Sequence, residues 1–442
     1  MKRIDLTKGK VISVLTALAI PIMGSSLLQF TYNLIDMLWV GRLGSNAVAS
    51  IGSSSFYIGL GYSVNALVII GCGIKVAHAI GEKDDRNIKE YINAGFFINL
   101  IIGFIFMVSI IFLGKNFINY LNLNNPIVER DSYTYLLISG PTMVIAFFNL
   151  LYARILGSFG NNKLAFNINA IGIIINIILD PILIYTFKLG VLGAALATLV
   201  ANIVMFFTYI FRCKEILKYN FKYKLDYKKV IEIVKLGFPM SLQRVLFTII
   251  NIILARIISR FGTDAIAAQK IGLQIESITY MVVGGLNGAI SSFTGQNFGA
   301  KKYNRINEGY NTALKIGIIY SFIMTVLFLF FNIPIIKLFI RDEATIIISS
   351  SYLKIIAFSQ IFSTIEMVSN GLFTGVGKPK IPAMISIVFT VLRIPMALIF
   401  IEKFGLNGVW ISIALSSILK GIMAYLLYML KIRKEFRDVK VY

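Results

Sequence analysis

The chain has 442 residues, of which 57% are hydrophobic and 14% are charged, whereas soluble proteins carry about 25% charged residues. Its apolar residues form blocks of roughly 18 to 30, long enough to span a hydrocarbon core of about 30 Å. A soluble domain is therefore excluded, and an all-α, polytopic membrane protein is expected. The net charge of +22 would suit a nucleic-acid partner, but the positions of the basic residues argue against one.

Apolar runs between helix breakers predict twelve transmembrane helices in chain order. Their expected limits are 11–38, 46–74, 91–113, 133–153, 164–187, 190–211, 233–256, 264–296, 313–333, 348–373, 381–401 and 405–430. The first run is too long for a signal-peptide core. The basic stretch 212–232 is interpreted as a linker between an N-terminal lobe (1–211) and a C-terminal lobe (233–442).

Most of the 43 Lys and Arg side chains lie at the two termini and in alternate loops. Those loops lie near residues 80, 158, 222, 305 and 379. Because basic residues gather in cytoplasmic loops, this bias places both termini and the linker in the cytoplasm of a multi-pass plasma-membrane protein. The positive charge thus reflects the orientation of the chain in the lipid bilayer. No nucleic-acid partner is expected.

The two halves of the chain repeat each other. Residues 21–50 and 239–268 align without gaps at an offset of 218 and are identical at 8 of 30 positions, including Pro21/Pro239 and Gly44/Gly262. A later register, shifted by a few residues, pairs 188–196 with 403–411. Since each half holds six predicted helices, both halves start on the same side, which predicts two six-helix bundles related by a parallel repeat. Such a plan is typical of alternating-access transporters.

Asp36 follows about 25 uncharged residues, although a carboxylate inside a membrane helix costs about 2.5–3.5 kcal/mol. Counting residues from the predicted helix ends puts Asp36, Asp180 and Thr198 at similar depth. Asn176 lies one turn from Asp180, and Pro181 loosens the backbone beside it. These oxygen ligands suit a hard cation such as Na⁺, and two nearby carboxylates that resist being ionised together suit a proton. The alternative is that each aspartate only forms hydrogen bonds inside a packed bundle.

The predicted C-terminal lobe carries its own polar residues within the apolar runs. Its acids, Glu276 and Glu366, either pair with bases in the same lobe or contact a cationic substrate. The other candidates for a substrate cavity are Gln243, Gln360 and Arg393.

Metal, redox and enzyme chemistry find little support in the sequence. Cys72, Cys213 and the single histidine, His78, show no metal-ligand spacing, and no nucleophile motif or cofactor fingerprint is present. We therefore expect no metal site, no cofactor and no enzymatic activity. His78 is interpreted as an interfacial polar residue, with a proton relay as the alternative.

Several stretches carry a family resemblance that covers residues 11 to 430. These are "YNLIDMLWVGRLGSNAVAS" with "IGEKD", "RFGTDAIAA" with "GQNFGAKK", and "INIILDPILIYTFKLGVLGAALAT". The chain resembles the multidrug and toxic compound extrusion (MATE) family, whose members are twelve-helix, two-lobed antiporters that export organic cations and drugs against Na⁺ or H⁺. Within its prokaryotic DinF-like branch, the resemblance assigns the ion site to Asp36, Asn176, Asp180 and Thr198.

One departure bears on the C-terminal lobe. The other prokaryotic branch uses acids on helices 7 and 10, but here the body of helix 7 offers Gln243 and Arg244, and Glu366 lies one turn from the expected place. The N-terminal site is therefore preferred. The resulting hypothesis is an antiporter for small organic cations or drugs, coupled to Na⁺ or H⁺ and functional as a monomer. The alternative is a flippase for a lipid-linked saccharide or another amphiphile.

Overall fold

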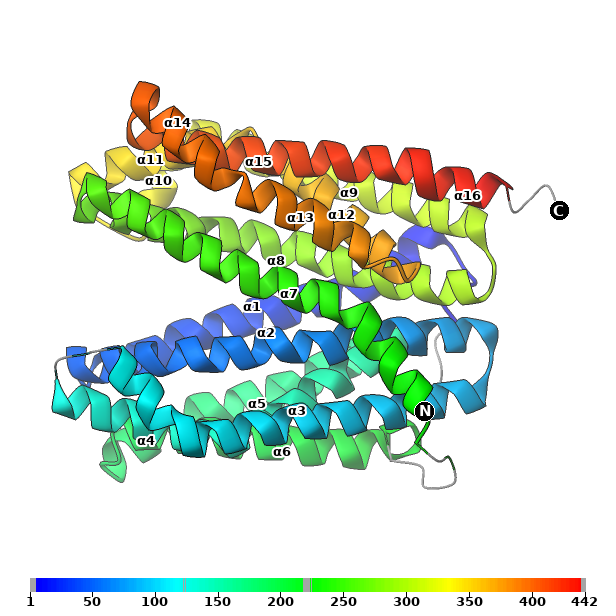
Figure 1. The fold of residues 1–442 in the computed structure, drawn as a ribbon, viewed down its shortest axis with the longest axis horizontal. Helices are drawn as coiled ribbons and strands as arrows, with labels where there is room; N and C mark the ends of the chain where they lie inside the picture. The colour runs from blue at the N-terminus through cyan, green and yellow to red at the C-terminus, as the bar shows by residue number, and fades with distance from the viewer. Residues whose placement is uncertain (1–4, 122, 124, 218–222, 224, 439–442) are drawn as a thin grey trace. The chain divides into compact units, whose positions relative to one another are not determined.

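The computed structural model describes residues 5–121, 123, 125–217, 223 and 225–438, and over these residues the chain is helical and contains no strand (Figure 1). The first half contains α1 (Val11–Gly41), α2 (Ser45–Glu82), α3 (Asp85–Tyr120), α4 (Pro126–Ser158), α5 (Asn162–Pro181), the π-helical turn η1 (Ile182–Thr186) and α6 (Val191–Leu217). The second half contains α7 (Tyr227–Ile258), η2 (Ser259–Phe261), α8 (Thr263–Gly299), α9 (Tyr303–Phe330), α10 (Asn332–Lys337), α11 (Glu343–Ala357), α12 (Gln360–Gly375), α13 (Lys380–Val391), α14 (Arg393–Phe404), α15 (Leu406–Leu427), η3 (Tyr428–Ile432) and α16 (Arg433–Asp438).

The predicted class, an all-α polytopic membrane protein, is confirmed. Ten stretches of the described chain are long and apolar enough to cross a membrane, and the bent pair of α11 and α12 makes an eleventh. The twelfth predicted span is α8, whose Gln, Glu, Asn, Ser and Thr side chains set it apart from the apolar helices. Of the predicted linker, residues 218–222 and 224 lie outside the described residues, while α6 runs to Leu217 and α7 begins at Tyr227.

The backbone repeats at the offset seen in the sequence. Gly44 and Gly262, the residues before α2 and α8, have φ of 103° and 101°, a conformation that only glycine adopts without strain. Lys83 and Lys301, which follow the same two helices, have φ of 60° and 57°. The equivalent turns are therefore built the same way in both halves.

The chain packs as two compact units that do not divide at the predicted linker. One contains Gly24–Ser241, and the other contains Leu6–Met23 together with the described residues from Leu242 onward. Both α1 and α7 thus contribute to two units, and they change unit at equivalent positions of the repeat. The lobe limits 1–211 and 233–442 remain a prediction.

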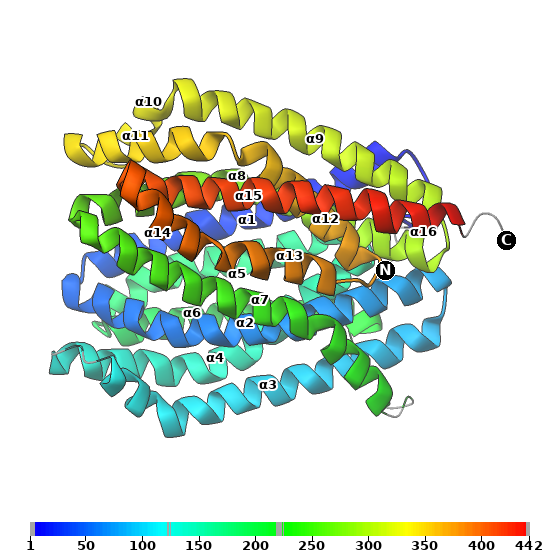
Figure 2. The same cartoon turned by 45° about the horizontal axis from the view of Figure 1, so that its top comes forward.

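In the first unit, α2, α3 and α4 pack on one another, and α4 also packs on α5 and α6 (Figure 2). Tyr152 of α4 lies at the centre of this packing, 5.4 Å from the Phe96 ring and 5.8 Å from the Phe206 ring between centroids. Cys72 and Cys213 are free thiols buried in the same core. Both cysteines therefore act as apolar packing residues here.

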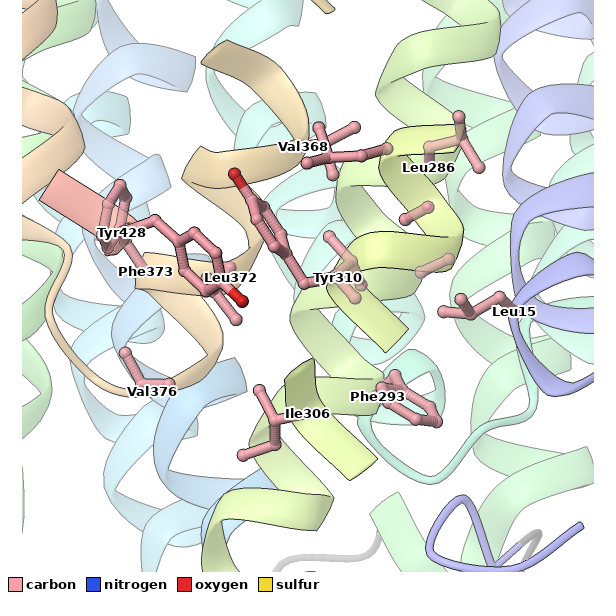
Figure 3. Packing of buried hydrophobic residues seen from close by; sticks show 14 of the residues in the cluster. Leu15, Leu286, Phe293, Ile306, Tyr310, Val368, Leu372, Phe373, Val376 and Tyr428 are labelled. Atoms are coloured by element: carbon pink, nitrogen blue, oxygen red, sulfur yellow. The ribbon is translucent and has the colours of Figure 1, made fainter. Parts of the chain in front are cut away.

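In the second unit, the start of α1 packs against α8, α9 and α12. Leu15 lies in one cluster with Leu286 and Phe293 of α8 and Tyr310 of α9 (Figure 3). The Tyr310 hydroxyl shares a hydrogen bond of 2.7 Å with Ser369 of α12. The hydroxyl of this buried tyrosine is thus satisfied inside the apolar core.

Two predicted helices are broken in the structure. Residues 348–373 form α11 and α12, which meet at 56°, because the Ser359 hydroxyl donates to the Ile356 carbonyl at 2.8 Å and competes with the helix ladder. Residues 381–401 form α13 and α14, which part at Leu392. Pro395 explains that break because it lacks the N–H that would bond the Val391 carbonyl.

Replacing Gly237 with alanine will destabilise the protein by roughly 1–3 kcal/mol or more. A Cβ at Gly237 would lie 1.8 Å from the Leu67 carbonyl oxygen, so α7 could no longer approach α2 as closely. Gly59→Ala is the matched control because nothing lies within 4 Å of its added Cβ. Thermal unfolding of the two variants in detergent measures the difference, and equal melting temperatures would contradict this account of the close approach.

Candidate cation site

The C-terminal end of α1 is held against η1, the turn that follows α5. The Tyr185 hydroxyl donates to the Trp39 carbonyl at 2.5 Å, and the two rings meet edge to face at 6.2 Å. Val40 and Ile184 are buried beside this contact. Because α1 carries Asp36 one turn before Val40 and α5 carries Asp180 one turn before Ile184, the contact fixes the two carboxylates relative to each other.

Asp180 is completely buried, and Asn176, one turn earlier on α5, is 3% exposed. Neither carboxylate oxygen of Asp180 and neither polar atom of the Asn176 amide has a hydrogen-bond partner among the described residues. Most buried polar atoms in proteins are paired, since an unpaired one costs about 1–3 kcal/mol. Four unpaired atoms on one helix face therefore point to a bound ion, proton or water.

Asp36 on α1 is half-buried, and its carboxyl group interacts electrostatically with that of Asp180. Both carboxyl groups also interact electrostatically with the hydroxyls of Tyr32 and Tyr135. The Tyr32 hydroxyl also interacts with the Thr198 side chain of α6. The structure thus gathers Asp36, Asp180 and Thr198 around two tyrosines within one compact unit, and Asn176 lies one turn from Asp180 on α5.

The donor set fits a small cation. Two carboxylates, one amide and two kinds of hydroxyl provide the oxygen ligands that a hard ion such as Na⁺ prefers. The Thr198 hydroxyl also donates to the Ala194 carbonyl at 3.0 Å, which orients its oxygen lone pairs away from its own helix. The paired acids equally suit uptake and release of a proton.

The π-helical turn at η1 follows Pro181 directly. The sequence predicted that this proline loosens the backbone beside Asp180, and the structure places the irregular turn on its C-terminal side. A π turn at this place is typical of functional positions in helices.

Glu276 of α8 is buried in the second unit, and neutral donors surround it. Its carboxylate accepts hydrogen bonds from Tyr352 at 2.6 Å, from the Gln360 amide at 3.1 Å and from Tyr280 at 3.3 Å. Arg393 interacts with it only electrostatically. The sequence left two alternatives for Glu276, an ion pair with a base or contact with a cationic substrate. In the structure two tyrosines and an amide, rather than a base, donate hydrogen bonds to it.

The other polar candidates of the second unit lie on different helices. The Arg393 guanidinium donates to Ser416 at 2.6 Å and to Ser417 at 3.3 Å. The Gln243 amide donates to Ser386 at 2.9 Å. Glu366 is half-buried and interacts electrostatically with Arg393 and with the buried Lys420. Across the part of the chain that the structure describes, no group of three or more His, Cys, Asp or Glu could hold a metal ion.

The tyrosines were missed by the sequence reasoning. Tyr32 lies one turn before Asp36 on α1, so its spacing could have identified it. Tyr135 lies on α4, far from both Asp36 and Asp180 in the sequence, and only the fold brings it to the site. The same holds for Tyr352, which reaches Glu276 from α11.

Comparison with known proteins agrees with this architecture. The MatE family model matches residues 21–182 and again 239–399, and the two matches begin at the offset of 218 found in the sequence. The probable multidrug resistance protein YpnP of Bacillus subtilis is 25% identical over 97% of both chains. The multidrug export protein MepA of Staphylococcus saprophyticus is 25% identical over 96% of this chain and 95% of its own.

Among solved structures, a crystal structure of MATE in the bent conformation superposes with a TM-score of 0.93 at 23% identity and covers 100% of both chains. This likeness establishes the twelve-helix fold. The double match of the family model confirms the internal repeat and spans well over half of the sequence. The chain therefore belongs to the MatE family, the MATE multidrug efflux transporters.

Proposed function

We propose that the protein is a secondary antiporter of the DinF-like branch that exports organic cations or drugs in exchange for Na⁺ or H⁺. The unpaired atoms of Asp180 and Asn176 carry this proposal, because a buried acid without hydrogen bonds needs a transient partner. The names of relatives such as the multidrug export protein MepA support the class of substrate. The single chain, with its duplicated halves, is the transporting unit.

In this scheme the protein works across the plasma membrane, with both termini in the cytoplasm. The coupling ion enters from outside and binds between Asp36 and Asp180, with Asn176 and Thr198 completing its ligands. Binding changes the packing of the outer ends of α1 and η1 and lowers the affinity for substrate. By linkage, bound substrate must lower the affinity for the ion by the same factor.

The predicted substrate cavity is proposed to use Gln243, Gln360, Glu366 and Arg393. Glu366 provides a half-buried carboxylate for a cationic group. Glu276 supports the wall instead, because its oxygens already accept three hydrogen bonds.

Replacing Asp36 with asparagine will reduce gradient-driven efflux to the rate measured without a gradient. The substitution keeps the shape of the side chain but removes one of the two charges that hold the ion. Liposomes loaded with a fluorescent organic cation, with a Na⁺ gradient or a pH gradient imposed separately, measure this and identify the coupling ion. Asp264→Asn, which alters an exposed carboxylate at the start of α8, is the matched control.

Undiminished gradient-driven efflux by the Asp36→Asn variant would show that this site does not couple ion binding to transport. The same liposomes also test the alternative activity. Movement of a fluorescent lipid-linked diphosphate, without any efflux of organic cations, would replace the antiporter with a flippase.

A further inference from the structure

A cavity of about 490 Å³ lies where α5 begins and α6 ends. These two helices pack side by side (Figure 1). Three cationic side chains line it, Lys163, Arg212 and Lys214, against a single carboxylate from Glu215. The excess of positive charge attracts an anion. This cavity is separate from the cation site, which lies toward the opposite ends of both helices.

The exposed face of α5 changes from polar to apolar along the helix. Lys163 and Asn167 are exposed at the cavity, and Ile171, Ile174 and Ile178 continue the same face at helical spacing, 42%, 53% and 55% exposed. In a helix that spans a membrane, an exposed row of isoleucines faces acyl chains. The cavity thus lies at the boundary between hydrocarbon and water.

The end of α6 shows the same change. Phe207 and Phe211 are 51% and 74% exposed, and their rings stack at 6.3 Å between centroids. Arg212 and Lys214 follow at once, on either side of Cys213, whose φ of −122° and ψ of 20° interrupt the helix. An apolar surface and a basic cavity therefore meet within one helical turn.

Hydrogen bonds next to the cavity join α5 to α6 and cap the start of α5. The buried Tyr209 hydroxyl donates to the Asn169 side chain at 2.9 Å and joins α6 to α5. Asn161 caps α5 by accepting the Leu164 N–H at 3.2 Å. The hydrogen bonds thus join the two helices beside the cavity and cap the one that carries Lys163.

We propose that this cavity binds the phosphate headgroup of an anionic phospholipid of the cytoplasmic leaflet. The phosphodiester lies between Lys163, Arg212 and Lys214, and the acyl chains follow Phe207 and the isoleucines of α5. A zwitterionic headgroup brings its own cation close to the arginine and lysines and binds less tightly. The inference rests on the proposed orientation of the chain in the membrane and not on the proposed transport reaction.

The test titrates the purified full-length protein in neutral detergent with phosphatidylglycerol or phosphatidylcholine and counts bound lipids by native mass spectrometry. The protein is expected to prefer phosphatidylglycerol. In the R212Q/K214Q double variant that affinity should fall about 30-fold, since each basic group near a membrane surface contributes about a fivefold effect. N167W, which fills the cavity and leaves its charges intact, should lose the lipid as well and covers the case in which the double variant folds poorly.

K431Q/K434Q is the matched control, because it removes two exposed lysines from the C-terminal end of the chain, which is expected on the same side of the membrane. Equal losses in both double variants would reveal general charge attraction and overturn the proposal. Undiminished lipid binding by R212Q/K214Q and N167W would do so as well. Glycerol 3-phosphate added without acyl chains should not compete, and if it displaces the lipid the cavity is a site for soluble phosphate. Because lipid binding is measured without transport, failure of the antiporter proposal leaves these outcomes unaffected.

Discussion

Replacing Asp180 with asparagine will abolish ion-driven efflux and will leave the melting temperature unchanged or higher. The carboxylate is completely buried and accepts no hydrogen bond from the described residues. Removing its charge therefore costs no hydrogen bond within the described part of the protein, but it removes a principal ligand of the proposed ion site. Efflux from liposomes and thermal unfolding in detergent measure the two effects on the same preparation.

The stability effect should be clearer with Asp180→Leu. Replacing a buried, poorly paired polar group with an apolar residue of similar size is neutral or stabilising by about 1–4 kcal/mol. Asp131→Asn is the control, because that partly exposed carboxylate pairs with its exposed neighbour Arg130 at 3.1 Å and should affect neither measurement. A large loss of stability in Asp180→Leu would mean that the aspartate is a structural residue after all.

Replacing Glu276 with leucine will have the opposite effect and will destabilise the protein by about 3–5 kcal/mol. Tyr352 and Gln360 would each lose their acceptor while remaining buried. Glu276→Gln keeps an oxygen in place and should cost less than half as much. Thermal unfolding of both variants measures the difference.

The control for Glu276 is Glu402→Gln, which alters an exposed glutamate of α14. If Glu276→Leu unfolds like the wild type and only efflux is lost, Glu276 contacts the substrate and does not support the wall. The experiments on the two buried acids are therefore complementary. The oxygens of Asp180 accept no hydrogen bond from the described residues, whereas those of Glu276 accept three.

The sequence could locate Asp36 and Asp180 at a common depth because the helical rise is constant and the helix ends are marked by breakers. The repeat was visible because turns that need glycine, such as Gly44 and Gly262, keep their residue. Periodicity could not show that Tyr135 approaches the two acids, since that depends on how α4 packs against its neighbours. It also could not show that Glu276 accepts a hydrogen bond from Tyr352, which lies 76 residues later in the chain.

The breaks between helices were missed for a related reason. A serine at position 359 or a proline three residues into α14 is compatible with a continuous apolar run. Whether the helix bends depends on whether a backbone carbonyl near that residue keeps its hydrogen bond within the helix or accepts one from another donor.

The exchange of α1 and α7 between the two compact units has a consequence for biogenesis. The first turns of α1 leave the ribosome early, but Leu15 and its neighbours have no apolar partners until α8 and α9 have been synthesised. The nascent chain must therefore hold this segment in the bilayer as an unfinished element while the intervening helices insert. Cutting the polypeptide at the central linker would not yield two self-sufficient products, because each fragment would lack a piece that the other carries.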